Sequence, residues 1–241
     1  STAWSRRRFM NIRGIYKTSL IDYPGKISAV LFTGGCNLRC RYCHNPDLAG
    51  NWQEMPLSSD EDTLDLLRKR KNLIDGVTIS GGEPTLSKDL FSFVEKIKEL
   101  QLAVKLDSNG LQPGVIRNLV AGGLLDYAAI DIKTSPEKYR LLTDSDVDFS
   151  NIAESIEVLR TSGIDYEVRT TCVPAYVTME DLASIRDAVG RVRKYFLQQF
   201  QREARLLDRA WEVIEPYPVE TLRQFRDFIL TFADRCEIRG I

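Results

Sequence analysis

The stretch FTGGCNLRCRYCHNP, Phe32 to Pro46, is the most informative part of this 241-residue chain. It holds three of the five cysteines, in the spacing C-x3-C-x2-C: Cys36, Cys40 and Cys43. The apolar run Ile27–Phe32 leads into it and predicts a buried strand. The cysteines therefore lie just beyond the carboxyl end of a strand, where α/β folds place their chemistry. Three thiolates in a short loop that contains glycines can converge on one metal centre.

Three cysteines at this spacing could bind an iron–sulfur cluster, bind zinc or be unrelated buried thiols. Cubane clusters normally take four thiolates, so a triplet leaves one iron free to bind a small molecule. Structural zinc also takes four ligands, and His44 directly follows Cys43, which makes it a poor fourth ligand. Free cysteines do not usually cluster at ligand spacing. The spacing favours a cluster over zinc, and zinc over chance.

The triplet, with an aromatic residue, Tyr42, before its last cysteine, resembles the signature of radical S-adenosylmethionine (SAM) enzymes. The longer stretch KTSLIDYPGKISAVLFTGGCNLRCRYCHNPDL, Lys17–Leu48, is similar to the activating enzymes of glycyl-radical enzymes. Within that group it most resembles the activating protein of anaerobic ribonucleoside-triphosphate reductase. The related pyruvate formate-lyase activase has a histidine after its last barrel strand, where this chain has Gln198, Gln199 and Gln201. That difference favours the reductase branch.

The resemblance implies a [4Fe–4S] cluster on the three cysteines, with SAM on its fourth iron. One electron from a flavodoxin- or ferredoxin-type donor would cleave SAM to a 5′-deoxyadenosyl radical, which would abstract a hydrogen atom from a glycine of the partner enzyme. No catalytic residue is expected beyond the cluster and its SAM, and the chain has only one histidine. The alternatives are a pyruvate formate-lyase-type activase, another radical SAM enzyme with a small-molecule substrate, and a zinc-binding module.

Two further motifs follow predicted strands. The first is Gly81-Gly82-Glu83-Pro84, whose glycines let a ligand approach the backbone and whose carbonyl and carboxylate oxygens suit an ammonium group. Alone it could be a plain turn; the resemblance implies that it binds the amino group of SAM. The second, Asp107-Ser108-Asn109-Gly110, could also be a turn, or its oxygens could bind ribose hydroxyls or a small cation. The family more often has threonine where this chain has Ser108.

Three charged residues on later strands complete the expected cofactor site. Strand alternation places Asp131 and Lys133 on one face, where a salt bridge inside the barrel is an equally open interpretation. The resemblance implies that Lys133 and Arg169 lie near the SAM carboxylate, and that Asp131 joins Asp107 at a monovalent cation site. Arg169 could instead form a surface ion pair, which would stabilise the fold little. Cys172 and Cys236 are expected to be core thiols.

Apolar runs that alternate with amphipathic ones predict a repeated βα pattern. Strands are expected at Ile27–Phe32, Val77–Ser80, Leu102–Leu106, Tyr127–Ile132, Tyr166–Val173 and Arg193–Gln199. Helices are expected at Asp60–Lys71, Lys88–Leu100, Gly114–Ala121, Ile152–Thr161, Met179–Val189 and Val219–Ala233. The pattern implies an α/β fold with a parallel sheet and outer helices, and about six units are too few for an eight-stranded barrel. This agrees with the partial (βα)6-type barrel of radical SAM enzymes.

Composition bounds the remaining possibilities. With 43% hydrophobic residues and a net charge of −1, the chain can bury one substantial core and has no bias towards nucleic acid or a membrane surface. We expect one domain over residues 1–241, with the cluster loop at 33–46 and a tail at 1–12. The odd cysteine count, without a secretory or bilayer-spanning run, predicts a reducing cytoplasm. Arg6-Arg7-Arg8 has no predicted partner. The charge-rich segment Gln201–Arg209 has no assigned role, and its simplest interpretation is a solvated helix.

Overall fold

The computed structural model describes residues 10–203 and 205–241, and in this part of the chain eight strands form one sheet. The sheet follows the order of the sequence. Strands β2 to β8 run parallel to their neighbours, and β1 is antiparallel to β2. The strands are β1 (Ile12–Ser19), β2 (Ser28–Thr33), β3 (Gly76–Gly81), β4 (Ala103–Ser108), β5 (Tyr127–Asp131), β6 (Asp165–Cys172), β7 (Val192–Gln199) and β8 (Ala233–Arg239).

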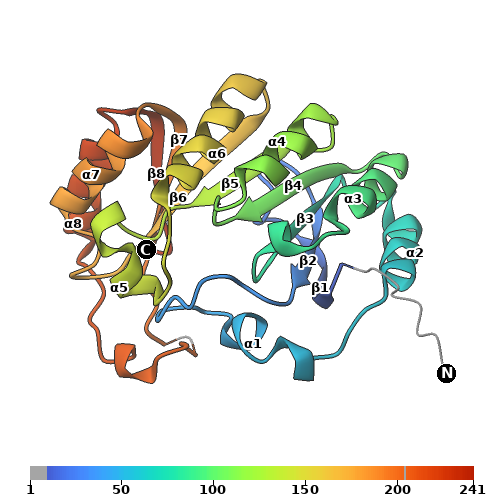
Figure 1. The fold of residues 1–241 in the computed structure, drawn as a ribbon, viewed down its shortest axis with the longest axis horizontal. Helices are drawn as coiled ribbons and strands as arrows, with labels where there is room; N and C mark the ends of the chain where they lie inside the picture. Colours follow the sequence, from blue (N-terminus) through green and yellow to red (C-terminus); the bar gives the residue numbers. More distant parts are fainter. Residues whose placement is uncertain (1–9, 204) are drawn as a thin grey trace.

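At least one helix connects each parallel strand to the next, and the longer helices form an arc outside the strands (Figure 1). The α-helices are α1 (Pro46–Ala49), α2 (Asp60–Arg70), α3 (Leu90–Glu99), α4 (Pro113–Ala121), α5 (Tyr139–Thr143), α6 (Phe149–Ser162), α7 (Met179–Val189) and α8 (Val219–Ile229). The six connections from β2 to β8 make an open, partial barrel, so the predicted fold class is confirmed.

Local sequence explains why these elements form. In α3 the buried residues Leu90, Phe93, Val94 and Ile97 follow helical spacing and pack against the sheet. Thr178 caps α7 reciprocally with Asp181, which satisfies backbone donors at the start of that helix. The central strands are apolar and almost fully buried, because helices cover one face and the barrel interior the other.

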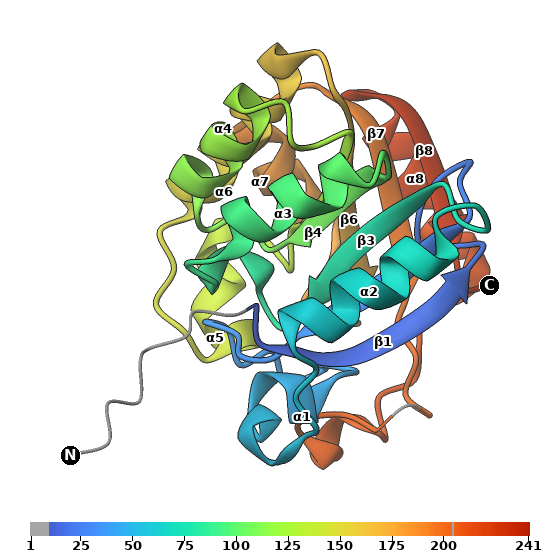
Figure 2. The ribbon, with the colours of Figure 1, turned by 90° about the vertical axis from the view of Figure 1, so that its right-hand side faces the viewer.

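The two edge strands were not predicted. Figure 2 shows β1 as a long strand along the edge of the sheet, with α2 beside it, where Arg70 donates to the hydroxyl of Thr18 at 2.6 Å. At the other edge, the expected helix Val219–Ala233 ends at Ile229, and Ala233 already begins β8.

The described residues of the segments 1–12 and 201–209 differ from a tail and a helix. Met10 and Ile12 have no exposed surface, so the described part of the tail packs into the core, whereas Arg6-Arg7-Arg8 lies outside the described residues. The solvated helix considered for Gln201–Arg209 is wrong: its described residues up to Asp208 form turns and loop, and Arg209 begins a short 3-10 helix, Arg209–Trp211. No helix among the described residues is long and apolar enough to cross a membrane.

Candidate functional site

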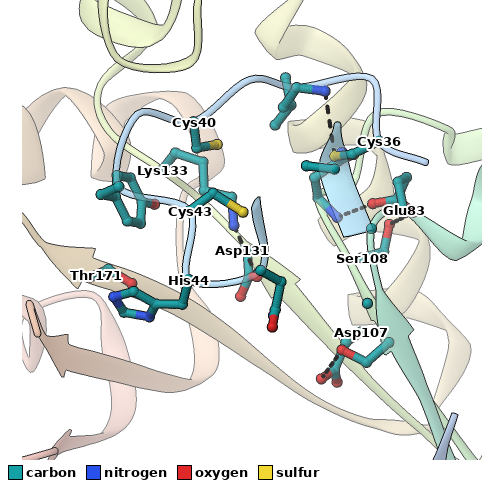
Figure 3. A pocket seen from close by; sticks show the side chains of 18 of the residues that line it. Cys36, Cys40, Cys43, His44, Glu83, Asp107, Ser108, Asp131, Lys133 and Thr171 are labelled. Atoms are coloured by element: carbon teal, nitrogen blue, oxygen red, sulfur yellow. Dashed lines mark hydrogen bonds and ion pairs between the residues drawn. The ribbon is translucent and has the colours of Figure 1, made fainter. Parts of the chain in front are cut away.

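The carboxyl ends of the parallel strands open into a cavity of about 250 Å³, shown in Figure 3. The structure brings nearly all of the predicted site residues to its wall. These are Cys36, Cys40, Tyr42, Cys43, Gly81, Gly82, Glu83, Asp107, Ser108, Asn109, Asp131, Lys133 and Arg169. Pro84 is the exception: it is buried at the start of a short 3-10 helix, Pro84–Leu86, and does not line the cavity.

The cysteine loop, which we define as residues 34–45, is held by its main chain. Gly35 donates to the carbonyl of Leu48 at 2.8 Å, and the backbone N–H of Arg39 donates to Thr143 at 2.9 Å. The Arg39 guanidinium also bonds the carbonyls of Ala49 at 2.7 Å and Cys36 at 3.1 Å. The loop therefore has a fixed path that does not depend on bonds from the thiols.

The two glycines after β3 join this loop to the sheet. The N–H of Gly82 donates to Thr33, and that of Glu83 donates to the carbonyl of Gly35, both at 2.8 Å. A Cβ on Gly82 would overlap that same carbonyl oxygen. Gly81 has φ +112°, and a Cβ there would lie 2.5 Å from the backbone nitrogen of Thr33. The glycines are thus required for the close approach of two backbone segments, in addition to the ligand access that the sequence suggested.

Glu83 ties the ends of β3 and β4 together. Its carboxylate accepts from the backbone N–H of Asn109 at 2.7 Å, the hydroxyl of Ser108 at 2.9 Å and the hydroxyl of Thr85 at 2.5 Å. Burial raises the pKa of Glu83, and these hydrogen bonds offset part of that increase. The side chain of Asn109 in turn donates to Asn37 in the cysteine loop at 2.7 Å. The strand ends and the loop form one connected rim.

A charge network lies deeper in the barrel, and we define it as Lys105, Asp107, Asp131, Lys133 and Arg169. Arg169 donates to Asp131 at 2.6 Å and to Asp107 at 3.3 Å. Lys133 pairs with Asp131 at 3.0 Å, and Lys105 pairs with Asp107. The salt bridge between Asp131 and Lys133 inside the barrel is therefore present, and the surface location considered for Arg169 is wrong, because its side chain is only 12% exposed.

The network keeps both of its carboxylates ionised. Burial acts to raise the pKa of Asp131, but Arg169 and Lys133 outweigh it, so the pKa lies well below its ordinary value. Asp107 has a lowered pKa as well, since Arg169 and Lys105 outweigh the effect of its burial. Figure 3 shows Asp131 and Lys133 between the cysteines and Asp107. The inner end of the cavity therefore carries ionised carboxylates paired with cationic side chains.

For the thiols, unlike the two carboxylates, the effect of burial on the pKa outweighs that of neighbouring cations. Burial raises the pKa of Cys36, Cys40 and Cys43, that of Cys40 to about 12, and the nearby ammonium of Lys133 lowers all three in part. Among the described residues, no group of three His, Cys, Asp or Glu side chains could hold a single metal ion.

Several residues of the cavity were missed by sequence reasoning. Ser80 and Thr171 line it from strand ends, and Asn45 and Ala49 line it beyond the last cysteine. Ser80 ends the predicted strand Val77–Ser80, and its hydroxyl donates to Asp107 at 3.2 Å. Its place at a strand end could have suggested it as a residue of the cavity. His44 and Gln198 also reach the wall. Cys172 and Cys236 are buried in the hydrophobic core, as predicted.

Comparison with known proteins places this fold and site in a class. Residues 30–189 match the family model of the radical SAM superfamily. The chain is 34% identical to a Methanocaldococcus jannaschii protein named as a glycyl-radical enzyme activating enzyme, over 95% of this chain and 96% of that protein. It is 29% identical to the pyruvate formate-lyase-activating enzyme of Clostridium pasteurianum, over 76% of this chain and 77% of that protein.

Solved structures resemble the fold. Streptococcus suis SuiB bound to S-adenosylmethionine superposes with a TM-score of 0.65 at 15% identity, over 85% of this chain and 48% of that longer chain. QueE from Escherichia coli superposes with a TM-score of 0.57 at 11% identity, over 95% and 93% of the two chains. The chain therefore belongs to the radical SAM superfamily and, within it, to the glycyl-radical enzyme activating enzymes.

The superfamily implies a [4Fe–4S] cluster and SAM, and the residues present fit both groups. Three free thiols share one cavity; the backbone N–H of Leu38 donates to Cys36 at 3.4 Å, and the backbone of Asn45 bonds to Cys43. The hydroxyl of Tyr42 is buried at the same wall without a hydrogen-bond partner among the described residues. Buried polar atoms are normally bonded, so the hydroxyl is available to a group that enters the cavity.

Proposed function

We propose that this protein activates a glycyl-radical enzyme, most specifically anaerobic ribonucleoside-triphosphate reductase, by generating a radical on a glycine of that partner. The observation that carries the proposal is the convergence of the cysteine triplet with the strand-end motifs of β3, β4 and β5 in one cavity. When bound, the cluster and SAM supply the one-electron chemistry that produces a carbon radical. The protein has to bind, orient and shield these groups.

Each part of the cavity wall has a role in this proposal. Cys36, Cys40 and Cys43 would ligate three irons of the cluster. The oxygens of the loop Gly81–Glu83 would accept from the amino group of SAM. Their acceptor character suits an ammonium, and the buried carboxylate of Glu83 is already oriented by its hydrogen bonds.

The carboxylate and the ribose of the cofactor would meet the remaining wall. Lys133 and Arg169 line the cavity and would pair with the carboxylate of SAM, since both carry fixed positive charge. Ser108 and Asn109, together with Asp107, would face the ribose hydroxyls. Tyr42 supplies a free hydroxyl beside the cysteines.

Sequence coverage and one residue of the cavity wall bear on the choice of partner. The similarity to the M. jannaschii activating enzyme extends over nearly the whole of both chains, whereas the C. pasteurianum enzyme matches over about three quarters. At the end of β7 the cavity wall carries the amide Gln198, where the resemblance to a pyruvate formate-lyase activase would have called for histidine. A pyruvate formate-lyase-type activase, named among the similar proteins, is the second candidate.

Anaerobic electron paramagnetic resonance tests the proposal on the reconstituted, reduced protein. We expect a reduced [4Fe–4S] signal that changes when SAM is added, followed by a glycyl-radical doublet when the anaerobic reductase is supplied. A reduced flavodoxin- or ferredoxin-type protein should serve as the electron donor, and the five free cysteines agree with a cytoplasmic location.

The matched control is the reductase with its radical glycine replaced by alanine, which should give no doublet. A doublet with pyruvate formate-lyase but not with the reductase would assign the second candidate instead. A cluster signal that responds to SAM, without a doublet from either partner, would overturn activation of these enzymes while leaving the superfamily assignment in place.

A further inference from the structure

Lys105 is the feature of the barrel interior that the proposed SAM site does not use. It lies two residues before Asp107 on β4, so both side chains point into the barrel. Its side chain is 2% exposed and pairs with Asp107. Lys105 does not line the cysteine cavity; it lines a second cavity of about 470 Å³ together with Glu167, Arg169 and Arg239. The paired carboxylate of Asp107 offsets the cost of burying this side chain.

The carboxylates of Asp107 and Asp131 have no oxygen without a cationic donor. On Asp107, Oδ1 accepts from Lys105 and Oδ2 from Arg169 at 3.3 Å. On Asp131, Oδ1 accepts from Arg169 at 2.6 Å and Oδ2 from Lys133 at 3.0 Å. A metal cation needs these same oxygens as ligands, and it would have to enter among three fixed positive charges. The residues present therefore do not fit the monovalent cation that the resemblance implies at this pair.

The balance of charge in the barrel interior points the same way. Glu167, which is 1% exposed, pairs with Arg239 at 3.2 Å and lies 3.9 Å from Arg169. With Glu83, which is buried at the rim, the described residues place four carboxylates beside four cationic side chains, Lys105, Lys133, Arg169 and Arg239. The carboxylates of Asp107, Asp131 and Glu167 are each already paired with a cation, so none of these three needs a further one.

We propose that the ammonium of Lys105 takes the place of a monovalent metal cation at the Asp107–Asp131 pair, so that SAM binding to this protein needs neither K⁺ nor Na⁺. Lys133 and Arg169 line the cysteine cavity, where the carboxylate of SAM would meet them. Lys105 lies behind Asp107 and remains with it. Lys105 is a positioning residue: it acts by holding Asp107 ionised and in place. The inference rests on the proposed SAM site but not on transfer of a radical to any partner.

The test compares salts at equal ionic strength, with KCl, NaCl and tetramethylammonium chloride at about 100 mM, so that screening is constant. The reconstituted protein is titrated with SAM and followed through its cluster signal. We expect the wild-type affinity to differ by less than about twofold among the salts. In Lys105→Ala the affinity should fall about tenfold or more in tetramethylammonium and recover in K⁺ or Na⁺, because a charged hydrogen bond is lost and a small ion can replace it.

A second readout uses the full chain without its cluster. The melting temperature of Lys105→Ala should be higher in K⁺ or Na⁺ than in tetramethylammonium, whereas that of the wild type should be the same in all three. Lys194→Ala is the matched control. Lys194 lies 5.3 Å from the ring of Tyr127, which Lys105 also approaches at 5.9 Å, and it pairs with Asp165 at 3.3 Å, but its side chain is 27% exposed. This variant should show no ion specificity.

Three results would overturn the proposal. The first is a wild-type affinity for SAM that rises about tenfold in K⁺ or Na⁺, which corresponds to a metal cation at the site. The second is a folded Lys105→Ala protein that binds weakly in every salt, and the third is one that binds normally in all of them. Where Lys105→Ala does not fold, the comparison of wild-type SAM affinity among the three salts still decides. Lys105→Met keeps the volume of the side chain but leaves no room for an ion, so it should bind SAM weakly and K⁺ or Na⁺ should not restore the affinity. Absence of a glycyl radical on any partner would count against the proposed function alone.

Discussion

The cysteine loop and the charge network face the same cavity, yet they are stabilised in opposite ways. In the loop the main chain is bonded to neighbouring segments while the thiols are left almost without partners. In the network every carboxylate oxygen of Asp107 and Asp131 accepts from a cationic side chain. Burial raises the pKa of the thiols, whereas neighbouring cations lower that of the two carboxyls.

The difference separates two kinds of functional residue. The thiols contribute little to the fold and become useful when a metal cluster binds, so their loss should affect the cofactor and hardly the stability. The network is complete without any added group, and removal of one member leaves buried charge unpaired. Changes there should lower stability and cofactor binding together. The following predictions test this division, from the largest expected effect to the smallest.

Cys36→Ala should abolish the cluster. With two thiolates left, iron content after reconstitution should fall from about four atoms per chain to a small fraction of that, and the reduced cluster signal should disappear. The stability of the cluster-free protein should change by less than about 1 kcal/mol, since the thiol accepts one weak hydrogen bond. Iron and sulfide analysis and urea unfolding measure both.

The control is Cys172→Ala, which removes a thiol from the core without touching the cavity. It should keep the iron and the cluster signal and lose about 1–2 kcal/mol of stability through the space it leaves. A stable cluster in Cys36→Ala would contradict the assignment of that thiol as a ligand.

Arg169→Met should have the largest effect on the fold. It leaves Asp107 and Asp131 buried without their shared partner, and breaking such a pair costs about 3–5 kcal/mol. Urea unfolding of the cluster-free chain measures the loss. The control is Arg191→Met, whose ion pair with Asp234 is exposed and should contribute less than about 1 kcal/mol. Equal losses in the two variants would show that the network contributes nothing beyond a surface pair.

The sequence predicts the cysteine loop and the strand-end motifs better than it predicts the charge network. The cysteines and the motifs Gly81–Glu83 and Asp107–Asn109 each follow a predicted parallel strand, and such strand ends meet at one edge of a sheet, so their convergence was foreseeable. The partners in the network were not. Asp131 and Arg169 are neighbours because β5 and β6 pair in that register, which spacing along the chain does not reveal.

The missed elements have physical reasons too. In β8, charged residues alternate irregularly with Cys236 and Ile238, which hides the strand pattern. The strand also follows the apolar stripe of α8 after a short turn, so the sequence pattern did not separate the helix from the strand. The segment at Gln201–Arg209 looks like a solvated helix by composition. Its conformation is set instead by tertiary contacts: the backbone N–H of Asp208 donates to the carbonyl of Arg41 at 2.9 Å, and Arg205 pairs with Asp47 at 2.8 Å.

Gly82→Ala should cost about 2–3 kcal/mol, because the new methyl group would overlap the backbone carbonyl of Gly35 and push the β3 loop away from the cysteine loop. The displacement should also weaken SAM binding, which a titration followed by the cluster signal would measure. Gly114→Ala is the control: nothing lies within 4 Å of its added Cβ, and its position in α4 favours alanine. If both variants unfold at the same urea concentration, the close approach of the two loops does not matter for stability.

Acid should weaken the network in a defined range of pH. The pKa of Asp131 lies below its ordinary value of 3.8, so the unfolded chain takes up a proton that the folded chain refuses. The stabilisation from its ion pairs is complete above pH 3.8 and is lost as the pH falls towards the folded value, by about 1.4 kcal/mol per pH unit. In Asp131→Asn this contribution to the pH dependence of the unfolding free energy should vanish. The unfolding free energies of the wild type and the variant should therefore differ most near neutral pH and converge as the pH falls below about 4.

Urea unfolding of the cluster-free protein between about pH 5 and pH 3 measures the two slopes, and repetition in about 1 M salt separates buried from exposed charges. The convergence should persist in salt, because Arg169 and Asp131 pair inside the barrel with side chains 12% and 26% exposed. Parallel curves for the two proteins would mean that Asp131 is protonated at the same pH in the folded and unfolded chains. The charge network would then resemble the thiols of the cysteine loop, because its side chains would contribute little to stability before the cofactor binds.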